Sequence, residues 1–439
     1  MLVSVLLAMA IHYFLRTSSG KAECEALFEE VVEEVCQEFR SGRVIGELCP
    51  DLCTPEPLLR DGSRWEAEPG EGDGADAGVG RQEGAGRGLR LIDCPDQGWH
   101  GGKEIVVSVT WRRRKLVMKG KKASIRSLML DLPVRHGAIH QRVEDYYAAV
   151  VNDSLAAVTH ADQEISQNIH HLTPWQEDGL AWMNRSSWRT LSLLSQDPEF
   201  LMTRLMHAIP VPRPHRLHDQ LFPFIASSCG HLYVSEYADQ ILDSSFVVPS
   251  VVPFVSRSVG EKIDAGIKLI QFLIRFTNQA GDRELCDVKL NQFAVFSSSD
   301  QVLLIDSDMI YTKDFVRTSL QAMHSCKSNH ECNFFDCNGL CIPSPAGEHL
   351  SICILDDEDN NLRRICRNVI FPFPFNLFGF RQNLFGLLSD LASNEFGQEI
   401  SQIQQLCESS SNITMLPNAN EILQVMEGIQ KKIKKEVRT

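Results

Sequence analysis

The sequence predicts an α+β protein with two unequal lobes, and three features of the 439-residue chain indicate this. β-Branched segments come first, at residues 104–111 and 116–119. A helical segment near residues 199–207 separates them from further strands within residues 221–237. From about residue 261 onward, helical periodicity dominates. This order predicts a small β-rich lobe followed by a larger, mainly helical lobe.

Composition excludes several classes of protein. The chain has 43 Lys and Arg against 57 Asp and Glu, a formal net charge of −14, and a hydrophobic share of 43%. An acidic balance argues against general nucleic-acid binding, which needs a basic surface. The hydrophobic share is typical of globular proteins and excludes wholesale disorder. We therefore expect a folded protein with no nucleic-acid partner.

The first ninety residues contain three different kinds of segment. Residues 1–20 include an apolar run that would span about 21 Å as a helix, so we interpret them as a signal-anchor or a truncated transmembrane segment. Residues 21–60 hold a helix over 24–40, with Leu27, Val31, Val35 and Phe39 on one face, and then a cysteine-stapled turn at 49–53. Residues 61–88 are rich in Gly and Glu and predict a flexible insert.

Residues 89–238 predict the β-rich N-lobe, with a helical insert at about 123–195. Strands 104–111 and 116–119 flank a polar turn at 112–115. The Ser-Ser-Cys-Gly turn at 227–230 joins strands expected at 221–225 and 231–237.

Residues 239–439 predict the C-lobe. The apolar spacing indicates a core helix over 261–278 through Ile263, Ile267, Ile270 and Ile274, and further helices over 384–406 and 420–435. The last helix should turn Ile422, Val425, Ile429 and Ile433 inward, and its basic end at 431–435 suits a helix C-terminus.

The 14 cysteines and three glycosylation sequons favour an oxidising, lumenal compartment. Zinc is the alternative, but the cysteines lack the paired C-x2-C spacing of common zinc modules. We expect the sequons at Asn152, Asn184 and Asn412 to carry glycans, and we expect everything after the N-terminal apolar segment to lie in the lumen. The clustered disulfide candidates are Cys24, Cys36, Cys49, Cys53, Cys326, Cys332, Cys337, Cys341, Cys353 and Cys366.

Two polar stretches could carry chemistry. Asp287 and Lys289 precede an apolar strand, and Asp306 and Asp308 follow the apolar run 302–305. The separation of Asp287 from Asp306 allows a hairpin that brings both carboxylates to one end. Carboxylates beside a lysine and an amide make a magnesium and phosphate site plausible, although an Asp that closes a strand is usually a turn residue.

These stretches together resemble a protein kinase. D-V-K-L-N-Q-F at 287–293 resembles the catalytic loop, Asp306 resembles the metal-binding aspartate, and Lys119 resembles the lysine of the third strand. A kinase would have a glycine-rich loop before this lysine, and the chain has Gly98, Gly101 and Gly102 near that place. These glycines do not form the G-x-G-x-x-G motif. The sequence is similar to the divergent protein kinase domain 1 family, whose members are cysteine-rich, kinase-like proteins of the endoplasmic reticulum. The matching segments are residues 46–53, 228–233, 285–289, 331–337 and 360–366.

The resemblance implies a bilobal kinase fold and a role for each site residue. It also implies a single-pass position in the endoplasmic reticulum membrane with a lumenal C-terminal domain, with the Golgi or secretion as alternatives. Lys119 would hold the ATP phosphates, with Glu199 or, as runner-up, Glu144 as its acidic partner. Residues Glu236, Tyr237 and Ala238 would form the interlobe hinge that faces adenine. Asp287 would accept the proton of the substrate hydroxyl, Lys289 would steady the phosphate, and Asp306 would bind Mg²⁺ or Mn²⁺.

Four features depart from kinases or from the family. The metal-binding asparagine of kinases is replaced by Gln292 or, one position early, by Asn291. Asp308 stands where kinases have glycine, and neither an A-P-E motif nor a calcium-binding EF-hand loop occurs. The activity expected is phosphate transfer to a protein or glycan hydroxyl. The alternatives are a pseudokinase binding module and, from the D-x-D at 306–308, a metal-dependent glycosyltransferase.

Overall fold

The computed structural model describes residues 24–53, 89–94, 104–121, 125, 185–208, 220–246, 256–323, 325–344, 351–371, 375–377, 380–382, 386–388 and 395–436. The predicted anchor at 1–20, the insert at 61–88 and the glycine-rich stretch at 98–102 lie outside these residues, as do Glu144, Asn152 and Asn184. Among the described helices, none is both long and apolar enough to cross a membrane.

The chain is a mixed α and β protein that divides into two compact units. Unit 1 comprises Met1–Val151, Thr173–Asp197 and Phe224–Tyr237, and unit 2 comprises Asn152–Leu172, Pro198–Pro223 and Ala238–Thr439. The division differs from the predicted lobes at Pro198–Pro223, which group with unit 2. Each unit is described separately below.

Unit 1 is built on a five-stranded antiparallel sheet with the strand order β1-β2-β3-β5-β4. Its strands are β1 (Arg90–Asp93), β2 (Glu104–Trp111), β3 (Arg114–Lys121), β4 (Ile225–Cys229) and β5 (Leu232–Glu236). Arg112 and Arg113 both adopt positive φ angles, so the β2–β3 turn has two residues, as tight hairpins require. The predicted strands at 104–111 and 116–119 are confirmed.

One predicted strand of unit 1 was placed four residues too early. β4 runs over Ile225–Cys229 rather than 221–225, and the following turn is centred on Gly230 and His231. Ser227 and Ser228 are buried in the sheet, although their polarity made them look like turn residues. Gly230 has a φ of 58°, a conformation that glycine adopts without strain.

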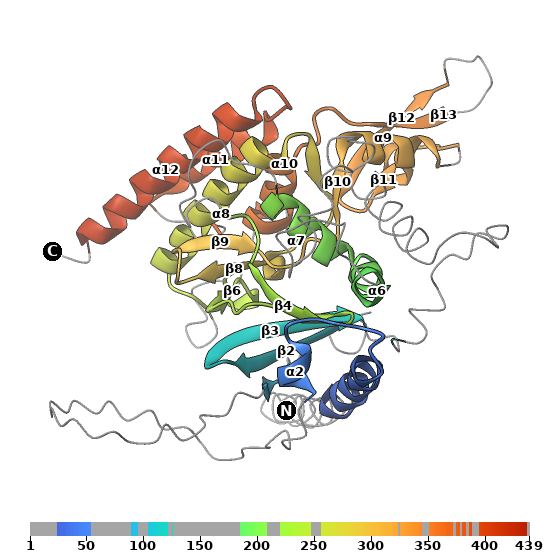
Figure 1. Ribbon diagram of the computed structural model, residues 1–439. Helices are drawn as coiled ribbons and strands as arrows, with labels where there is room; N and C mark the ends of the chain where they lie inside the picture. The colour runs from blue at the N-terminus through green and yellow to red at the C-terminus, as the bar shows by residue number, and fades with distance from the viewer. Residues whose placement is uncertain are drawn as a thin grey trace, which may run out of the picture. The chain divides into compact units, whose positions relative to one another are not determined.

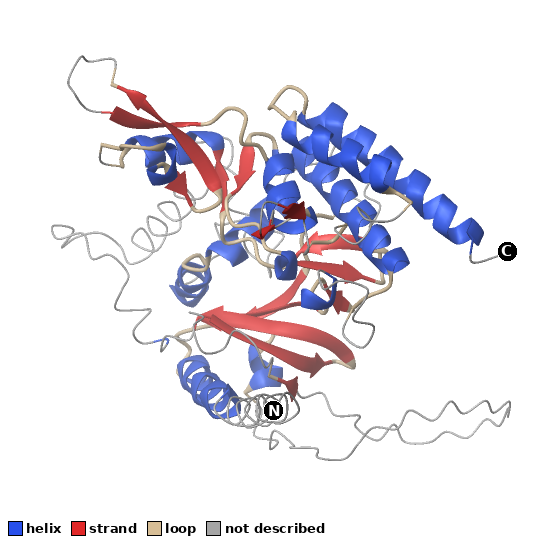
Figure 2. Cartoon of the chain, turned by 180° about the vertical axis from the view of Figure 1, so that it is seen from behind, coloured by secondary structure: helices blue, strands red, loops and turns tan. Residues whose placement is uncertain are grey.

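Helices pack on the sheet of unit 1, and disulfides link two of them, the helix over 24–40 and the helix over 49–52, to other parts of the unit. The helix over 24–40 lies beside the sheet of unit 1 (Figure 2). Its Phe28, Val31 and Val35 share a core with Ile105 and Val107 of β2. This helix was predicted. The other helices of the unit are α2 (Cys49–Leu52) and α6 (Arg185–Leu194).

The predicted stapled turn at 49–53 is largely the one-turn helix α2, and its cysteines do not bond to each other. Cys49 bonds to Cys229 and Cys53 bonds to Cys36. A Cβ atom on Gly46 would lie 1.9 Å from the carbonyl oxygen of Ser228, so only glycine permits this close approach to β4.

Unit 2 is mainly helical, with short antiparallel sheets between the helices. Its strands pair in the orders β6-β8-β9, β7-β10, β11-β12-β13 and β14-β15. Those strands are β6 (Gln240–Ile241), β7 (Arg283–Leu285), β8 (Phe293–Phe296), β9 (Gln301–Leu304), β10 (Ile310–Thr312), β11 (Asn333–Phe334), β12 (Cys337–Pro343), β13 (Ser351–Leu355), β14 (Phe375–Leu377) and β15 (Phe380–Gln382).

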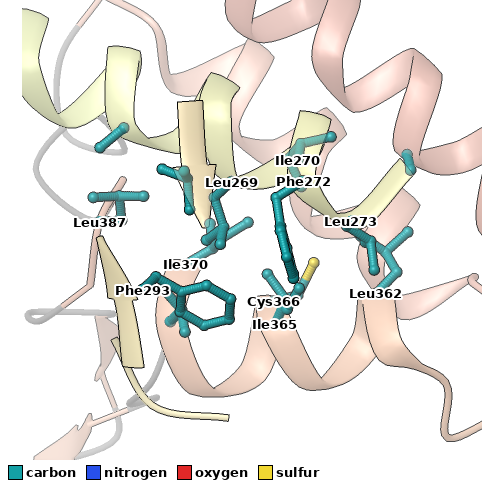
Figure 3. Packing of buried hydrophobic residues seen from close by; sticks show 14 of the residues in the cluster. Leu269, Ile270, Phe272, Leu273, Phe293, Leu362, Ile365, Cys366, Ile370 and Leu387 are labelled. Carbon is teal, nitrogen blue, oxygen red and sulfur yellow. The ribbon is translucent and has the colours of Figure 1, made fainter. Parts of the chain in front are cut away.

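Most helices of unit 2 surround one large apolar core, whereas the helix over 313–321 packs in a smaller cluster with disulfide-bonded cysteines. They are α7 (Pro198–Ala208), α8 (Val259–Ala280), α9 (Lys313–Gln321), α10 (Asn361–Ile365), the π-helical turn Cys366–Ile370, α11 (Gly397–Glu408) and α12 (Met415–Glu436). α8 packs against α12, which packs against α11 (Figure 1). Phe272 of α8 meets the ring of Phe293 edge to face at 5.4 Å, beside Leu362, Ile365 and Cys366 (Figure 3).

The predicted core helix of unit 2 is confirmed and extends to Val259–Ala280. A capping box explains its start: Ser258 accepts from the backbone N–H of Glu261, whose side chain accepts from the backbone N–H of Ser258. Of the predicted helix at 384–406, the part from Gly397 onward is α11, and residues 386–388 and 395–396 form bends and turns. Residues 384–385 and 389–394 of that prediction lie outside the described residues. The last helix starts at Met415, before the predicted residue 420.

All 14 cysteines are paired, which confirms the disulfide prediction. Four partners outside the predicted set, Cys94, Cys229, Cys286 and Cys407, complete the bridges. The pairs are Cys24–Cys94, Cys36–Cys53, Cys49–Cys229, Cys286–Cys337, Cys326–Cys341, Cys332–Cys353 and Cys366–Cys407. Within the described residues, the sulfurs of Cys326, Cys332 and Cys341 converge as metal ligands would, but disulfide bonding removes the thiolates that zinc requires.

Candidate functional site

A β-hairpin of unit 2 brings the two predicted acidic stretches to one end. β8 and β9 are antiparallel, with Phe293 opposite Leu304. Asp287 lies in the loop that enters β8, and Asp306 follows the end of β9. The backbone N–H of Ile305 donates to the carbonyl oxygen of Gln292 at 2.8 Å, which ties the two stretches together.

Asp287 is held through one oxygen of its carboxylate. Its Oδ2 atom accepts from Lys289 Nζ at 2.8 Å and from Gln292 Nε2 at 2.9 Å. Within the described residues, Oδ1 has no hydrogen-bond partner. The side chain of Asp287 is 19% exposed and that of Lys289 is 63% exposed. The carboxylate is therefore oriented by two donors and keeps one oxygen available to another molecule.

Lys289 is surrounded by negative charge. The hydrogen bond with Asp287 raises the pKa of Lys289 above its ordinary value, burial works in the opposite direction, and the charges of Asp287, Asp306 and Asp336 add to the rise. The ammonium group is thus cationic at neutral pH. A fixed cation beside Asp287 can bind an anionic group.

Gln292 is an internal support of this loop. Its side chain is buried, its Nε2 donates to Asp287, and its Oε1 accepts from the backbone N–H of Lys289 at 2.9 Å. Asn291, the other predicted metal-binding amide, is exposed. The carbonyl of Gln292 has a second lone pair, so it could still face a cation, but its first role here is to orient Asp287.

Helix α7 is joined to the segment that carries Asp306. The hydroxyl of Ser307 donates to the backbone carbonyl oxygen of Glu199 at 3.4 Å and lies 3.3 Å from the hydroxyl of Thr203. Glu199 is buried in the first turn of α7, at the predicted helix. The backbone position of Glu199 is thus fixed relative to Asp306 and Asp308.

A buried arginine secures the strand that leads into the Asp287 loop. Arg364 is completely buried and donates to Glu284 Oε2 and Asp359 Oδ2, each at 2.9 Å, and to the carbonyl oxygen of Leu285 at 3.1 Å. Burial opposes its charge, but the two carboxylates outweigh burial and raise the pKa of Arg364 above its ordinary value. Asn361 adds bonds to the backbone of Arg283 and Leu285 in β7.

Asp336 contacts the loop from the cysteine-rich segment. Its backbone N–H donates to the carbonyl oxygen of Cys286 at 2.7 Å, and its Oδ2 accepts from the N–H of Val288 at 2.7 Å. Cys286 itself is disulfide-bonded to Cys337, the residue after Asp336.

The other predicted site residues belong mostly to unit 1. Lys119 is buried in β3, opposite Val106 and Tyr233, and Glu236 ends β5. The chain passes from unit 1 to unit 2 between Tyr237 and Ala238, at the predicted hinge. The meeting of Lys119 with the acidic residues of unit 2 stays a prediction.

Comparison with known families identifies part of the chain. Residues 192–409 match the family model described as the protein-kinase domain of FAM69. This stretch is a divergent kinase-like domain. It contains α7, the Asp287 loop, Asp306 and the cysteine-rich segment, whereas Lys119 lies before its start. The resemblance to divergent kinase-like proteins is thereby confirmed.

Three residues that shape the site received no role from the sequence, namely Asp336, Asn361 and Arg364. All three lie within the segments 331–337 and 360–366 that carry the family resemblance. Their place in these segments was the one sign in the sequence that they matter. It could not assign their roles, because the sequence around a polar residue does not show which distant backbone group its side chain will bond to.

Proposed function

We propose that the chain is a kinase of the secretory pathway that transfers the γ-phosphoryl group of ATP to a hydroxyl of a lumenal protein or glycan. The proposal rests on the hydrogen bonding of the Asp287 carboxylate. Its Oδ2 accepts from two donors, Lys289 and Gln292, while its Oδ1 is available to a substrate. This is the arrangement that a residue accepting a proton from a hydroxyl needs.

The chain's own residues divide the work of this reaction. Asp287 Oδ1 accepts the proton of the attacking hydroxyl, while Gln292 keeps the carboxylate in one orientation. Lys289, cationic and largely exposed, binds the phosphoryl group that moves. Because phosphoryl transfer depends mainly on positioning and electrostatics, the fixed loop provides the main catalytic contribution of unit 2.

The donor set fits a divalent cation held largely by the nucleotide. Mg²⁺ is usually bound by one or two carboxylates together with substrate phosphates, and Asp306 supplies a partly exposed carboxylate at the loop end. Asp308 supplies a further carboxylate two residues later, and the amides of Gln292 and Asn291 lie at the same end of the β8–β9 hairpin. When bound, Mg²⁺ or Mn²⁺ would neutralise phosphate charge.

A bilobal cleft is part of this proposal. Lys119 would hold the ATP phosphates with Glu199 as its partner, and Glu236, Tyr237 and Ala238 would present the hinge to adenine. The buried lysine in β3 and the passage between units after Tyr237 support these roles. The glycine-rich loop near Gly98 would complete the nucleotide site.

A lumenal position in the endoplasmic reticulum membrane, with residues 1–20 as the anchor, is also proposed. Seven disulfides that use every cysteine support an oxidising compartment. Asn412 is exposed in the turn before α12, which suits a glycan. The Golgi and secretion remain the alternatives, and the partner would be a lumenal protein or glycan.

One observation favours a second function, a pseudokinase that binds partners without transferring phosphate. The amide of Gln292 already bonds to Lys289 and Asp287, so only the second lone pair of its carbonyl oxygen is left for the role of the metal-binding amide of active kinases. Such a protein would use the same fold as a binding module.

Nucleotide binding by the oxidised protein tests the proposal. A thermal-shift panel of ATP, GTP and UDP-sugars with Mg²⁺ or Mn²⁺ should show stabilisation by ATP and metal that is lost in Lys119→Ala and Asp306→Ala. Asp314→Asn, an exposed change on α9, is the control. Stabilisation by UDP-sugars with no response to ATP would refute the kinase and revive the glycosyltransferase, and ATP binding without transfer would favour the pseudokinase.

A further inference from the structure

Asp336 contacts both peptide groups that flank Asp287. Its N–H donates to the carbonyl oxygen of Cys286, and its carboxylate accepts from the N–H of Val288, each at 2.7 Å. One residue of the cysteine-rich segment therefore fixes the backbone immediately before and immediately after Asp287. The disulfide Cys286–Cys337 joins the same two segments. However, it is formed by side chains and does not fix the orientation of the peptide groups on either side of Asp287.

Asp336 is itself held from a third direction. Asn368 Nδ2 donates to its Oδ2 at 2.8 Å, and Arg367 Nη2 donates to its backbone carbonyl oxygen at 2.9 Å. Both residues belong to the π-helical turn Cys366–Ile370 that follows the α10 network of Arg364. The position of Asp336 is thus determined by the helical core of unit 2 as well as by its own turn.

The turn between β11 and β12 is strained where it presents Asp336. Phe335 has a φ of 54°, which is unfavourable for a bulky residue, and its side chain is 58% exposed. Strain of this kind persists only where the surroundings enforce it, and it occurs preferentially at functional sites. Here the enforced backbone leaves an aromatic ring in solvent while Asp336 bonds to the Asp287 loop.

We infer that Asp336 is a positioning residue for Asp287, so that the cysteine-rich segment takes over the support of the catalytic loop. This inference rests on the proposed function for its effect on rate, but its structural part does not. Loss of the carboxylate releases the Val288 N–H and lets Asp287 shift, and a displacement of about 1 Å costs about 10²-fold in rate. Asparagine keeps an acceptor oxygen for Val288 without the charge.

Two variants and one control test the inference on the full oxidised chain. Hydrogen–deuterium exchange of the peptide covering 286–289 should become about tenfold faster in Asp336→Ala, because a lost bond exposes the amide to exchange. It should stay near the wild-type rate in Asp336→Asn. Glu331→Ala, in the same segment, removes a side chain that accepts from the backbone N–H of Lys327, and it should leave exchange unchanged.

Hydrolysis of ATP by water gives the second readout. Asp336→Ala should lower kcat about 10²-fold with KM for ATP unchanged, and Asp336→Asn should recover most of it. The inference would be overturned if residues 286–289 of Asp336→Ala exchanged as slowly as in the wild type. It would also be overturned if Asp336→Ala lost this protection from exchange but kept the wild-type kcat. A wild-type protein without any hydrolysis or transfer would refute the proposed activity instead, and exchange alone would then decide whether Asp336 fixes the loop.

Discussion

Replacing Arg364 by methionine should strongly destabilise unit 2. Methionine fills a similar volume but leaves the carboxylates of Glu284 and Asp359 buried without the cation that now lies 2.9 Å from each. The carbonyl oxygen of Leu285 and the side-chain oxygen of Asn361 lose a donor as well. Removing one partner of a buried ion pair costs about 3–5 kcal/mol, because the remaining charge stays desolvated.

The assay is equilibrium unfolding of the oxidised protein in urea, followed by intrinsic fluorescence. Arg317→Met is the matched control: Arg317 pairs with Asp314 on exposed α9, so its loss should cost no more than about 0.5 kcal/mol. The triple variant Arg364→Met, Glu284→Gln, Asp359→Asn should recover part of the loss, because it removes the two buried carboxylate charges. Asp359 keeps an ion pair with Arg367 at 3.0 Å in the single variant, so most of the recovery should come from Glu284. A cost below about 1 kcal/mol for Arg364→Met, or no recovery in the triple variant, would refute the reasoning.

Three further outcomes are expected. Desolvation lowers the pKa of His231 to about 4, so between pH 6.5 and 4 the unfolded chain binds a proton that the folded chain does not. Stability should fall by about 2 kcal/mol from pH 7 to pH 5, and His231→Asn should lack this loss in urea unfolding. Ser258→Ala removes the N-cap of α8 and should lower the free energy of unfolding in urea by about 1 kcal/mol. An unchanged free energy of unfolding would contradict a stabilising role for the capping box. Gln292→Asn shortens the side chain that orients Asp287, so ATP hydrolysis should slow about tenfold, whereas a faster rate would show that position 292 acts mainly as a metal ligand.

Local patterns predicted the elements whose side chains alternate cleanly between core and solvent. The strands β2 and β3 and the helix α8 were predicted because their apolar periodicity is strong, as in Ile263, Ile267 and Ile270. β4 was misplaced because Ser227 and Ser228 are buried in the sheet while reading as turn residues. Burial of such residues is decided by tertiary packing.

Long-range pairings could not be predicted from the sequence. Cys49 bonds to Cys229 across 180 residues, and no local spacing indicates that choice. Arg364 received no role from the sequence, yet it is completely buried, where Glu284 and Asp359 offer it two carboxylates. Asp287, Lys289 and Asp306 were predicted together because they lie close in sequence around one hairpin.

The most direct test of a catalytic Asp287 is single-turnover transfer from γ-labelled ATP by the oxidised, glycosylated protein. Label released as phosphate and label incorporated into secreted-protein peptides or oligosaccharides are both counted. We expect Asp287→Asn to bind ATP as the wild type does and to lose about 10²–10⁴-fold in transfer, with Asp314→Asn unaffected. Equal transfer by Asp287→Asn and the wild type would contradict the role of this loop.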